Sequence, residues 1–396
     1  MITVFDKKQD CCGCTACKSS CPTQAIKMKA DEEGFLYPEV NQKLCVDCKL
    51  CRKVCPLQNQ INVQDRFTEP LVYALKHKSD NVRMTSASGG AYTAISDYAL
   101  STSCTLYGVE FSGEFIVQHK GAITEAGRNK FKGSKYVQSN LGETFKQVYE
   151  DLATNKAVFF SGTPCEVAGL RKYMEISKVK TDKLILNDII CHGTPSPLLW
   201  KKYLNFIQKK KKLKSYTFRA KEKGWHGCNV KAEFENGKSK INTPDVKIYA
   251  NIFESNLALR QSCYHCRFSN LHRPSDITIG DFWGIEKSLP ELDDDKGISL
   301  IFVNTPKGQS IFNHMKNKID FVQSNTNDCL QPNLERPTKC PENREQFWDD
   351  YYKFGFIYIA KKYANFSLNA RIKRAAVILL KKFGLFQFIK NLVKRK

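Results

Sequence analysis

"CCGCTACKSSCP", residues 11–22, places five cysteines within twelve positions of the chain. Four of them follow the pattern C-x2-C-x2-C-x3-C before a proline, namely Cys11, Cys14, Cys17 and Cys21. The same pattern returns once, at Cys45, Cys48, Cys51 and Cys55. The chain therefore contains an internal repeat that is built on cysteine.

This spacing is typical of bacterial-type ferredoxins, in which three thiolates of one run and the fourth of the other run hold each 4Fe–4S cluster. It predicts one cluster on Cys11, Cys14, Cys17 and Cys55, and a second on Cys45, Cys48, Cys51 and Cys21. Zinc sites use pairs of C-x2-C rather than triplets followed by Cys-Pro, so the pattern favours clusters over zinc. Cys12 lies outside the pattern, and we expect it to be a spare thiol.

The composition indicates a globular protein of two or three domains, since 42% of its 396 residues are hydrophobic. The first ten residues, MITVFDKKQD, lack the apolar run of a signal peptide, and no stretch is long enough to span a bilayer. We therefore expect a cytoplasmic protein. Its 17 cysteines would be reduced there, which favours metal binding over disulfides.

The net charge of +22 is concentrated toward the C-terminus, where no acidic residue follows Asp350. Residues 361–396 hold eleven Lys and Arg among apolar residues at helical spacing. This pattern predicts a basic amphipathic tail, 351–396, that makes peripheral contact with the inner face of a membrane. The alternative is a helix packed on its own domain with a solvated basic face. No nucleic-acid-binding module is recognisable, so we expect no nucleic-acid partner.

Residues 1–60 form the expected ferredoxin domain, and the polar segment 61–70 is the expected linker. From Leu71 onward, apolar runs near 71–75, 157–160, 184–190, 276–280 and 299–303 read as strands. Helical patterns lie near 90–102, 141–153, 165–175 and 197–208. This alternation predicts an α+β chain with an α/β-like body over 71–350, whose loops at strand ends carry the site.

Two strand-to-helix junctions have residues suited to ligand binding. Ser88, Gly89 and Gly90 allow a tight turn whose N–H groups could face a phosphate, although such a turn is also a common helix cap. Cys165 opens a helix directly after Gly162, Thr163 and Pro164, and a helix N-terminus favours a thiolate.

A further group of thiols is formed by Cys165, by Cys191 after the next strand, and by the C-x2-C pair Cys263 and Cys266. Four thiolates are enough for a third cluster or a zinc site. Free buried cysteines are the alternative.

The segments "SASGGAYTAISDYAL", "GSKYVQS", "FSGTPCEVAGL", "DIICHGTPSP", "FRAKEKGW" and "DITIGDFWG" occur in that order between about residues 80 and 350. In sequence and order they resemble the beta-subunit family of coenzyme F420 (deazaflavin) hydrogenases and dehydrogenases. The resemblance implies a flavin-binding α/β domain that holds FAD non-covalently behind the ferredoxin domain. It also favours a third cluster on the four body cysteines.

The resemblance implies roles for individual residues in the body. Ser88, Gly89, Gly90 and Lys135 would contact a flavin or substrate phosphate, and Gly162, Thr163 and Pro164 would lie around the cofactor. Asp281 would hydrogen-bond cofactor or substrate, and His192 would donate a proton to a reduced substrate. The alternatives are a solvated Lys135, an Asp281 that caps a turn, and a structural His192.

Together these features predict an iron–sulfur flavoprotein oxidoreductase that passes electrons between its 4Fe–4S clusters, FAD and an organic substrate. We expect a redox partner protein, either a ferredoxin or a reductase. Similar ferredoxin-fused chains point by analogy to surface polysaccharide metabolism. The alternative is a non-catalytic electron-transfer subunit that serves a partner oxidoreductase.

Overall fold

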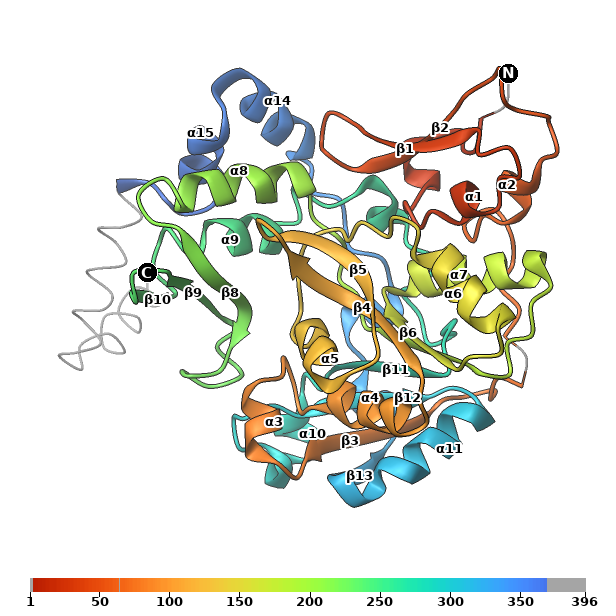
Figure 1. Cartoon of the computed structure of the whole chain (residues 1–396). Coiled ribbons are helices and arrows are strands. Elements are labelled where there is room, and N and C mark those ends of the chain that lie inside the picture. The colour runs from red at the N-terminus through yellow and green to blue at the C-terminus, as the bar shows by residue number, and fades with distance from the viewer. Residues whose placement is uncertain (1–2, 64, 369–396) are drawn as a thin grey trace. The chain divides into compact units, whose positions relative to one another are not determined.

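The computed structural model describes residues 3–63 and 65–368 (Figure 1). The chain divides into two compact units. The first contains the described residues of Met1–Leu198, Thr217–Asn229 and Leu259–Lys339, and the second those of Leu199–Tyr216, Val230–Ala258 and Cys340–Lys396. The cysteine repeat therefore lies in the same compact unit as most of the body, and the units do not divide at residues 60 and 350.

The sequence repeat at the N-terminus is also a structural repeat. Each copy ends in a short helix, α1 (Ala16–Ser19) or α2 (Leu50–Lys53), and the residue before each helix has a left-handed backbone conformation. Between the helices lies an antiparallel hairpin of β1 (Ile26–Ala30) and β2 (Leu36–Val40), and η1 (Lys8–Asp10) precedes α1. The two left-handed residues turn the chain so that the third cysteine of each run falls in the first turn of its helix.

An eight-stranded mixed sheet with the order β13-β3-β12-β11-β7-β6-β4-β5 forms the centre of the first unit. Its strands are β3 (Leu71–His77), β4 (Thr105–Ser112), β5 (Ile116–Ala122), β6 (Val158–Gly162), β7 (Leu184–Ile189), β11 (Ile277–Asp281), β12 (Ser299–Val303) and β13 (Ile319–Ser324). Strands β4, β6, β7 and β11 are parallel, and antiparallel strands flank them. The loops that follow β6 and β7 therefore start at the same edge of the sheet.

Helices cover both faces of this sheet, so its central strands are buried apolar runs. Val158 and Phe160 of β6 share a core with α6 (Thr144–Ala153) and α7 (Pro164–Ser177), whereas Phe159 packs with α4 (Ala91–Ser101) and α5 (Glu125–Phe131) on the other face. Cys14, Ala16 and Val54 of the repeat belong to the core on the α6 and α7 side. The repeat is thus packed onto one face of the body.

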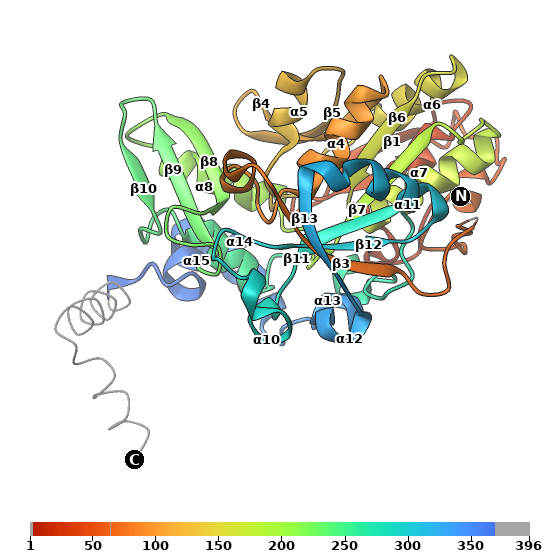
Figure 2. The same cartoon turned by 90° about the horizontal axis from the view of Figure 1, so that it is seen from below.

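The other helices of the first unit are short, apart from α11. They are α3 (Asp80–Met84), η2 (Gln261–His265), α10 (Ile285–Ser288), η3 (Pro290–Leu292), α11 (Pro306–Met315), η4 (Lys316–Lys318), α12 (Thr326–Cys329) and α13 (Pro332–Glu335). Figure 2 shows α4 on one side of β3 and β12, with α12 and α13 on the other.

The second unit is organised around aromatic side chains. Its elements are α8 (Pro197–Ile207), β8 (Leu213–Ala220), β9 (Asn229–Phe234), β10 (Ser239–Ile241), α9 (Ile248–Glu254), α14 (Arg344–Phe354) and α15 (Phe356–Tyr363), of which α8, β8 and β9 begin or end in the first unit. The rings of Trp200, Tyr203, Tyr216 and Tyr249 pack together, mostly edge to face. The hydroxyls of Tyr203 and Tyr216 both donate to the Val246 carbonyl, at 3.0 and 2.9 Å, so these buried polar groups are satisfied.

The predicted fold class, a ferredoxin-like segment followed by a larger α/β domain, is confirmed. The five predicted strands and four predicted helices all form, and the largest boundary error is the start of α6 at Thr144 instead of residue 141. Within residues 3–63 and 65–368, no helix is both long and apolar enough to cross a membrane. The basic tail beyond residue 368 lies outside the described residues, so its predicted membrane contact stays a prediction.

One buried histidine makes the stability of the first unit depend on pH. The His119 ring stacks on Phe160 and makes hydrogen bonds with the Ser139 hydroxyl and the Ser161 carbonyl. Burial lowers the pKa of His119 below its usual value of about 6.5. Below that pH the unfolded chain binds a proton that the folded chain resists, so the free energy of unfolding should fall as the pH falls.

We expect His119→Gln to lose part of this pH dependence when the free energies of unfolding in urea at pH 7.5 and 5.5 are compared with those of the native protein. The exposed His272 supplies the matched control. Equal pH dependence in His119→Gln and the native chain would contradict the assignment.

Candidate iron–sulfur site

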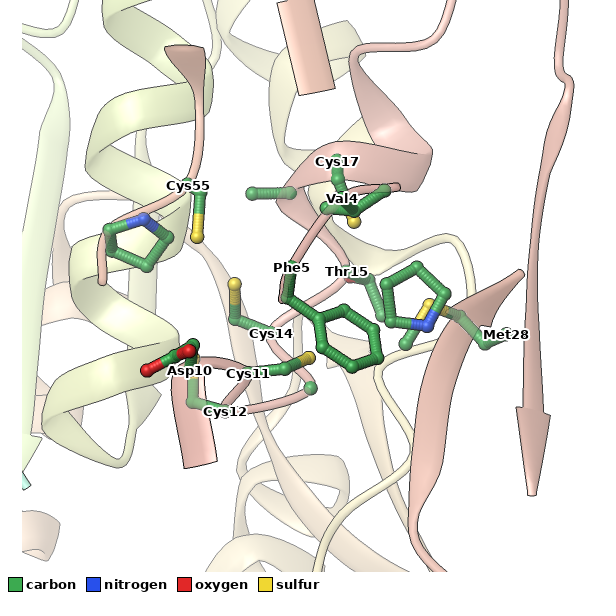
Figure 3. A pocket seen from close by; sticks show the side chains of 14 residues that line it. Val4, Phe5, Asp10, Cys11, Cys12, Cys14, Thr15, Cys17, Met28 and Cys55 are labelled. Atoms are coloured by element: carbon green, nitrogen blue, oxygen red, sulfur yellow. The ribbon is translucent and has the colours of Figure 1, made fainter. Parts of the chain in front are cut away.

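The residues of the first predicted cysteine set line one cavity. Cys11, Cys14, Cys17 and Cys55 line it, and Figure 3 shows these four side chains with Phe5 among the lining residues. Burial, followed by repulsion from Cys11 and Cys55, raises the pKa of the Cys17 thiol. The thiols are therefore close enough to interact, and metal binding here must release protons.

The residues of the second predicted set line a separate cavity. Cys21, Cys45, Cys48 and Cys51 line it, and the Ala25 N–H donates to the Cys21 sulfur at 3.2 Å. Burial, followed by repulsion from Cys48 and Cys45, raises the pKa of Cys51.

The predicted ligands of each cavity are thus three cysteines from one run and a fourth from the other run, as the spacing predicts, and Cys12 also lines the first cavity. Ligation of a cluster by these eight thiols stays a prediction, with a donor set that suits it.

The four body cysteines also come together, all within the first unit. Cys165 lies in the first turn of α7, directly after β6, and Cys191 follows the adjacent parallel strand β7. Cys263 lies in η2, and Cys266 ends it. Burial, then repulsion from Cys263, Cys165 and Cys266, raises the pKa of Cys191. Burial also raises the pKa of Cys263, to about 11.

Cys12, expected to be a spare thiol, lies between two of these groups. Its side chain is buried, and its thiol interacts with the thiols of both Cys14 and Cys165. The first set and the body cysteines are therefore in contact through Cys12. No spacing rule identifies this residue, because its partner Cys165 is 153 positions away in the sequence.

The close approach of α7 to the repeat requires a glycine. A Cβ atom at Gly169 would lie 2.7 Å from the Cys14 sulfur and 2.9 Å from the Cys14 Cβ. Gly169 lies one turn after Cys165 on α7. The same helix therefore presents Cys165 to Cys12 and its glycine to Cys14.

The Ser88–Gly90 turn lies against the sheet. The Ser88 hydroxyl donates to the Ile298 carbonyl at 2.7 Å, and a Cβ atom at Gly89 would meet the backbone of Leu75 and Ser299 at about 2.5 Å. Gly90, with φ +98, forms the N-cap of α4, and Ser299 Oγ accepts from the Ala91 N–H at 3.4 Å. In this structure these groups are engaged in packing and capping.

Lys135 and Asp281 also have partners within the first unit. Lys135 donates to the carbonyls of Lys130 and Lys132 at the end of α5, at 2.8 and 2.9 Å, and burial lowers its pKa to about 7. Asp281 pairs with Arg219 at 3.1 Å and accepts from the indole N–H of Trp225 at 3.0 Å. These contacts hold both side chains in place, and their predicted site roles stay predictions.

The remaining predicted residues lie beside the body cysteines. Gly162 ends β6, Thr163 caps α7 in a capping box with Glu166, and Pro164 is the first residue of the helix. The Thr163 hydroxyl lies 3.3 Å from the Cys165 sulfur. The His192 carbonyl accepts from Thr338 Oγ1 at 2.6 Å, and its half-buried side chain follows Cys191 directly.

A Gly169→Ala substitution tests whether the approach of α7 matters. In an ordinary helix interior this change stabilises by about 1 kcal/mol. Here we expect it to displace Cys14, so that purified protein loses about four irons per chain in anaerobic iron analysis. Glu175→Ala, on the exposed side of α7, is the matched control. Full iron content in Gly169→Ala would show that the cavity tolerates the extra methyl group.

Comparison with known proteins finds a family match for each part of this site. Residues 10–59 match the family described as 4Fe-4S dicluster domain, and residues 155–328 match the family described as the C terminus of the coenzyme F420 hydrogenase/dehydrogenase beta subunit. All four body cysteines lie within the second match, whereas Ser88, Gly89, Gly90 and Lys135 lie outside it.

A similar solved structure is a chain of the xenon-derivatised F420-reducing [NiFe] hydrogenase complex from Methanosarcina barkeri, at 14% identity and a TM-score of 0.46. The similarity covers 76% of this chain and 94% of that chain. No curated protein matches the sequence. The chain thus combines a segment similar to 4Fe–4S dicluster domains, residues 10–59, with a segment similar to the C terminus of coenzyme F420 hydrogenase/dehydrogenase beta subunits, residues 155–328.

Proposed function

We propose that this protein carries electrons between a redox partner, which binds near the exposed Cys48 of the second cysteine set, and the half-buried cysteines of its larger domain. The observation that supports this most directly is the position of Cys12, whose thiol interacts with Cys14 of the first set and with Cys165 of the body. A ferredoxin segment that served only as a separate carrier would need no such contact.

The residues of the two N-terminal sets fit 4Fe–4S clusters. Each cavity is lined by its four predicted thiols from two separate runs, with Cys12 as a fifth thiol in the first cavity, and the surrounding core is apolar on the side of α6 and α7. When bound, such clusters exchange one electron at a time, at potentials set by charge, hydrogen bonds and solvent exposure. The role of this chain is to supply the thiolates and to exclude water from the first set.

The body cysteines are proposed to hold a third cluster, with free thiols as the alternative. Cys165 and Cys191 follow adjacent parallel strands, the usual position of a ligand site in an open α/β sheet, and Cys263 and Cys266 complete the group. Burial and then repulsion from the other three raise the pKa of Cys191, as expected in a set of thiols that binds a cation.

The flavin is the part of the proposal that rests on the family resemblance. Ser88, Gly89, Gly90 and Lys135 do not fit a phosphate site as they stand, because packing, capping and hydrogen bonds within the chain engage them. We therefore assign no flavin contact to them and derive no step from a flavin. A flavin-dependent oxidoreductase acting on an organic substrate is the enzymatic form of the proposal, and surface polysaccharide metabolism stays a prediction by analogy.

Cysteine variants separate the proposed sites by iron content. We expect Cys48→Ser and Cys191→Ser each to remove about four irons per chain, because each set loses one of its four ligands. The measurement is iron and sulfide analysis with electron paramagnetic resonance under anaerobic conditions, and Cys340→Ser, at an exposed cysteine, is the control.

Unchanged iron in Cys191→Ser, with loss in Cys48→Ser, would reduce the proposal to two clusters and free body thiols. Flavin released on denaturation of the anaerobic protein would support the enzymatic form. Iron without flavin would favour the non-catalytic electron-transfer subunit.

The exposed edge of the second set suits an acidic partner. Cys48 is exposed beside Leu44 and Val46, whose side chains are 50% and 63% exposed, and Lys43 and Lys49 flank them. The exposed Asp47 lies within this stretch, so its two lysines leave it with a net positive charge. A small apolar patch with a net positive charge attracts an acidic protein at a rate that depends on salt.

We expect the double variant Lys43→Glu and Lys49→Glu to slow reduction of the protein by a reduced acidic ferredoxin about tenfold at low salt. Reduction by dithionite should not change, and Lys180→Glu, at an exposed residue, is the control. An unaltered rate with the ferredoxin in a stopped-flow measurement would place partner binding elsewhere.

A further inference from the structure

Arg260 links the loop of the body cysteines to the first cysteine set. Its side chain is 1% exposed, and its backbone forms the N-cap of η2, which carries Cys263. Its guanidinium Nε donates to the Cys11 carbonyl at 2.7 Å, and Nη2 lies 3.5 Å from the Cys11 sulfur. A residue of the body therefore reaches into the ferredoxin segment and contacts a predicted cluster ligand.

The surrounding residues hold this guanidinium in one orientation. Nη2 donates to the Leu36 carbonyl at 3.1 Å, and Nη1 donates to Gln138 Oε1 at 3.0 Å. The carbon at the centre of the guanidinium lies 4.0 Å from the centre of the Tyr37 ring, a cation–π contact. Gly13, with φ +76, leaves room for it, since a Cβ there would lie 3.1 Å from Nη1.

Arg260 differs from other buried arginines of the first unit in its lack of a carboxylate partner. Four of these pair with carboxylates: Arg83 with Asp294, Arg128 with Asp97, Arg219 with Asp281 and Arg273 with Asp188. Within the described part of the chain, no carboxylate forms an ion pair with Arg260. The ionisable groups that it contacts include the Cys11 thiol and the Tyr37 phenol.

A buried guanidinium without a counter-ion is costly, because several kcal/mol of hydration are lost. Neutral thiols and a neutral phenol do not supply the missing negative charge. Thiolates that bind a 4Fe–4S cluster do, since a cluster with four cysteine thiolates is an anion. The structure thus contains a fixed positive charge at the place where the proposed first cluster needs compensation.

We propose that Arg260 raises the reduction potential of the cluster that Cys11, Cys14, Cys17 and Cys55 would hold; this inference rests on the cluster assignment in the proposed function. Reduction transfers one electron from a one-electron donor, which is oxidised by one electron, and adds one negative charge next to the guanidinium. The buried charge and the N–H group that faces the Cys11 sulfur stabilise the reduced form more than the oxidised form. With Arg260 in place, the cluster of the first cysteine set is therefore a better electron acceptor than it would be without the guanidinium.

The test is a potentiometric titration of the full-length, anaerobically purified protein, followed by electron paramagnetic resonance. Cys14→Ser identifies the signal of the first set by its loss. In Arg260→Gln, we expect the midpoint of that signal to fall by at least about 59 mV, a tenfold change in the one-electron equilibrium. The midpoint of the second set should not move. Arg260→Lys keeps the charge and should retain most of the native midpoint, and Arg66→Gln, at an exposed arginine, is the control.

The proposal would be overturned if Arg260→Gln contained both clusters and the midpoint potential of the first set were unchanged. Loss of about four irons in both Arg260→Gln and Arg260→Lys would also overturn it, because the residue would then serve only to hold the site together. Loss of iron in the glutamine variant with a native midpoint in the lysine variant would support it. A native protein without any 4Fe–4S signal would contradict the proposed function itself, which keeps the two failures distinct.

Discussion

Helix α7 and the first cysteine run approach each other so closely that only hydrogen fits on Gly169 where it faces Cys14. This contact decides which thiols meet. One turn earlier, α7 places Cys165 beside Cys12, and the adjacent strand β7 delivers Cys191 to the same edge. If α7 did not lie this close to the first cysteine run, the thiols of the repeat would not contact the thiols of the body.

The site is a polar group of thiols inside an otherwise apolar core. Helices α6 and α7 and one face of the sheet surround the first set with Phe145, Val167 and Leu170, so its environment has a low dielectric constant. A charge in such an environment interacts strongly with other charges nearby. The single guanidinium of Arg260 can therefore have a large effect on the reduction potential of the proposed first cluster. The second set differs, because Cys48 and its neighbours are exposed. The two halves of a nearly symmetric repeat are thus placed in opposite environments, one suited to a partner and one to the body.

Several residues that suggest chemistry in the sequence also make contacts that support the architecture. The glycines of the Ser88–Gly90 turn let α4 start close to β3 and β12, and Lys135 closes the end of α5. Asp281 neutralises Arg219, whose guanidinium lies 5.0 Å from the centre of the Trp283 ring. Short glycine turns and single charged residues are common in structural roles, so without partners they do not identify a site.

The sequence alone determined the elements and the division of the eight N-terminal thiols. Local spacing fixes both: apolar periodicity sets strands such as β3 and β12, and the x2 and x3 intervals set which cysteines can share a cavity. The sequence alone did not indicate a role for Cys12, and it did not indicate that Gly169 and Arg260 contact the first cysteine set. Their functions depend on partners more than a hundred positions away, namely Cys165, Cys14 and Cys11. Only the packing of α7 and η2 against the repeat decides those contacts, because they arise from the shape and charge of surfaces that meet after the chain has folded.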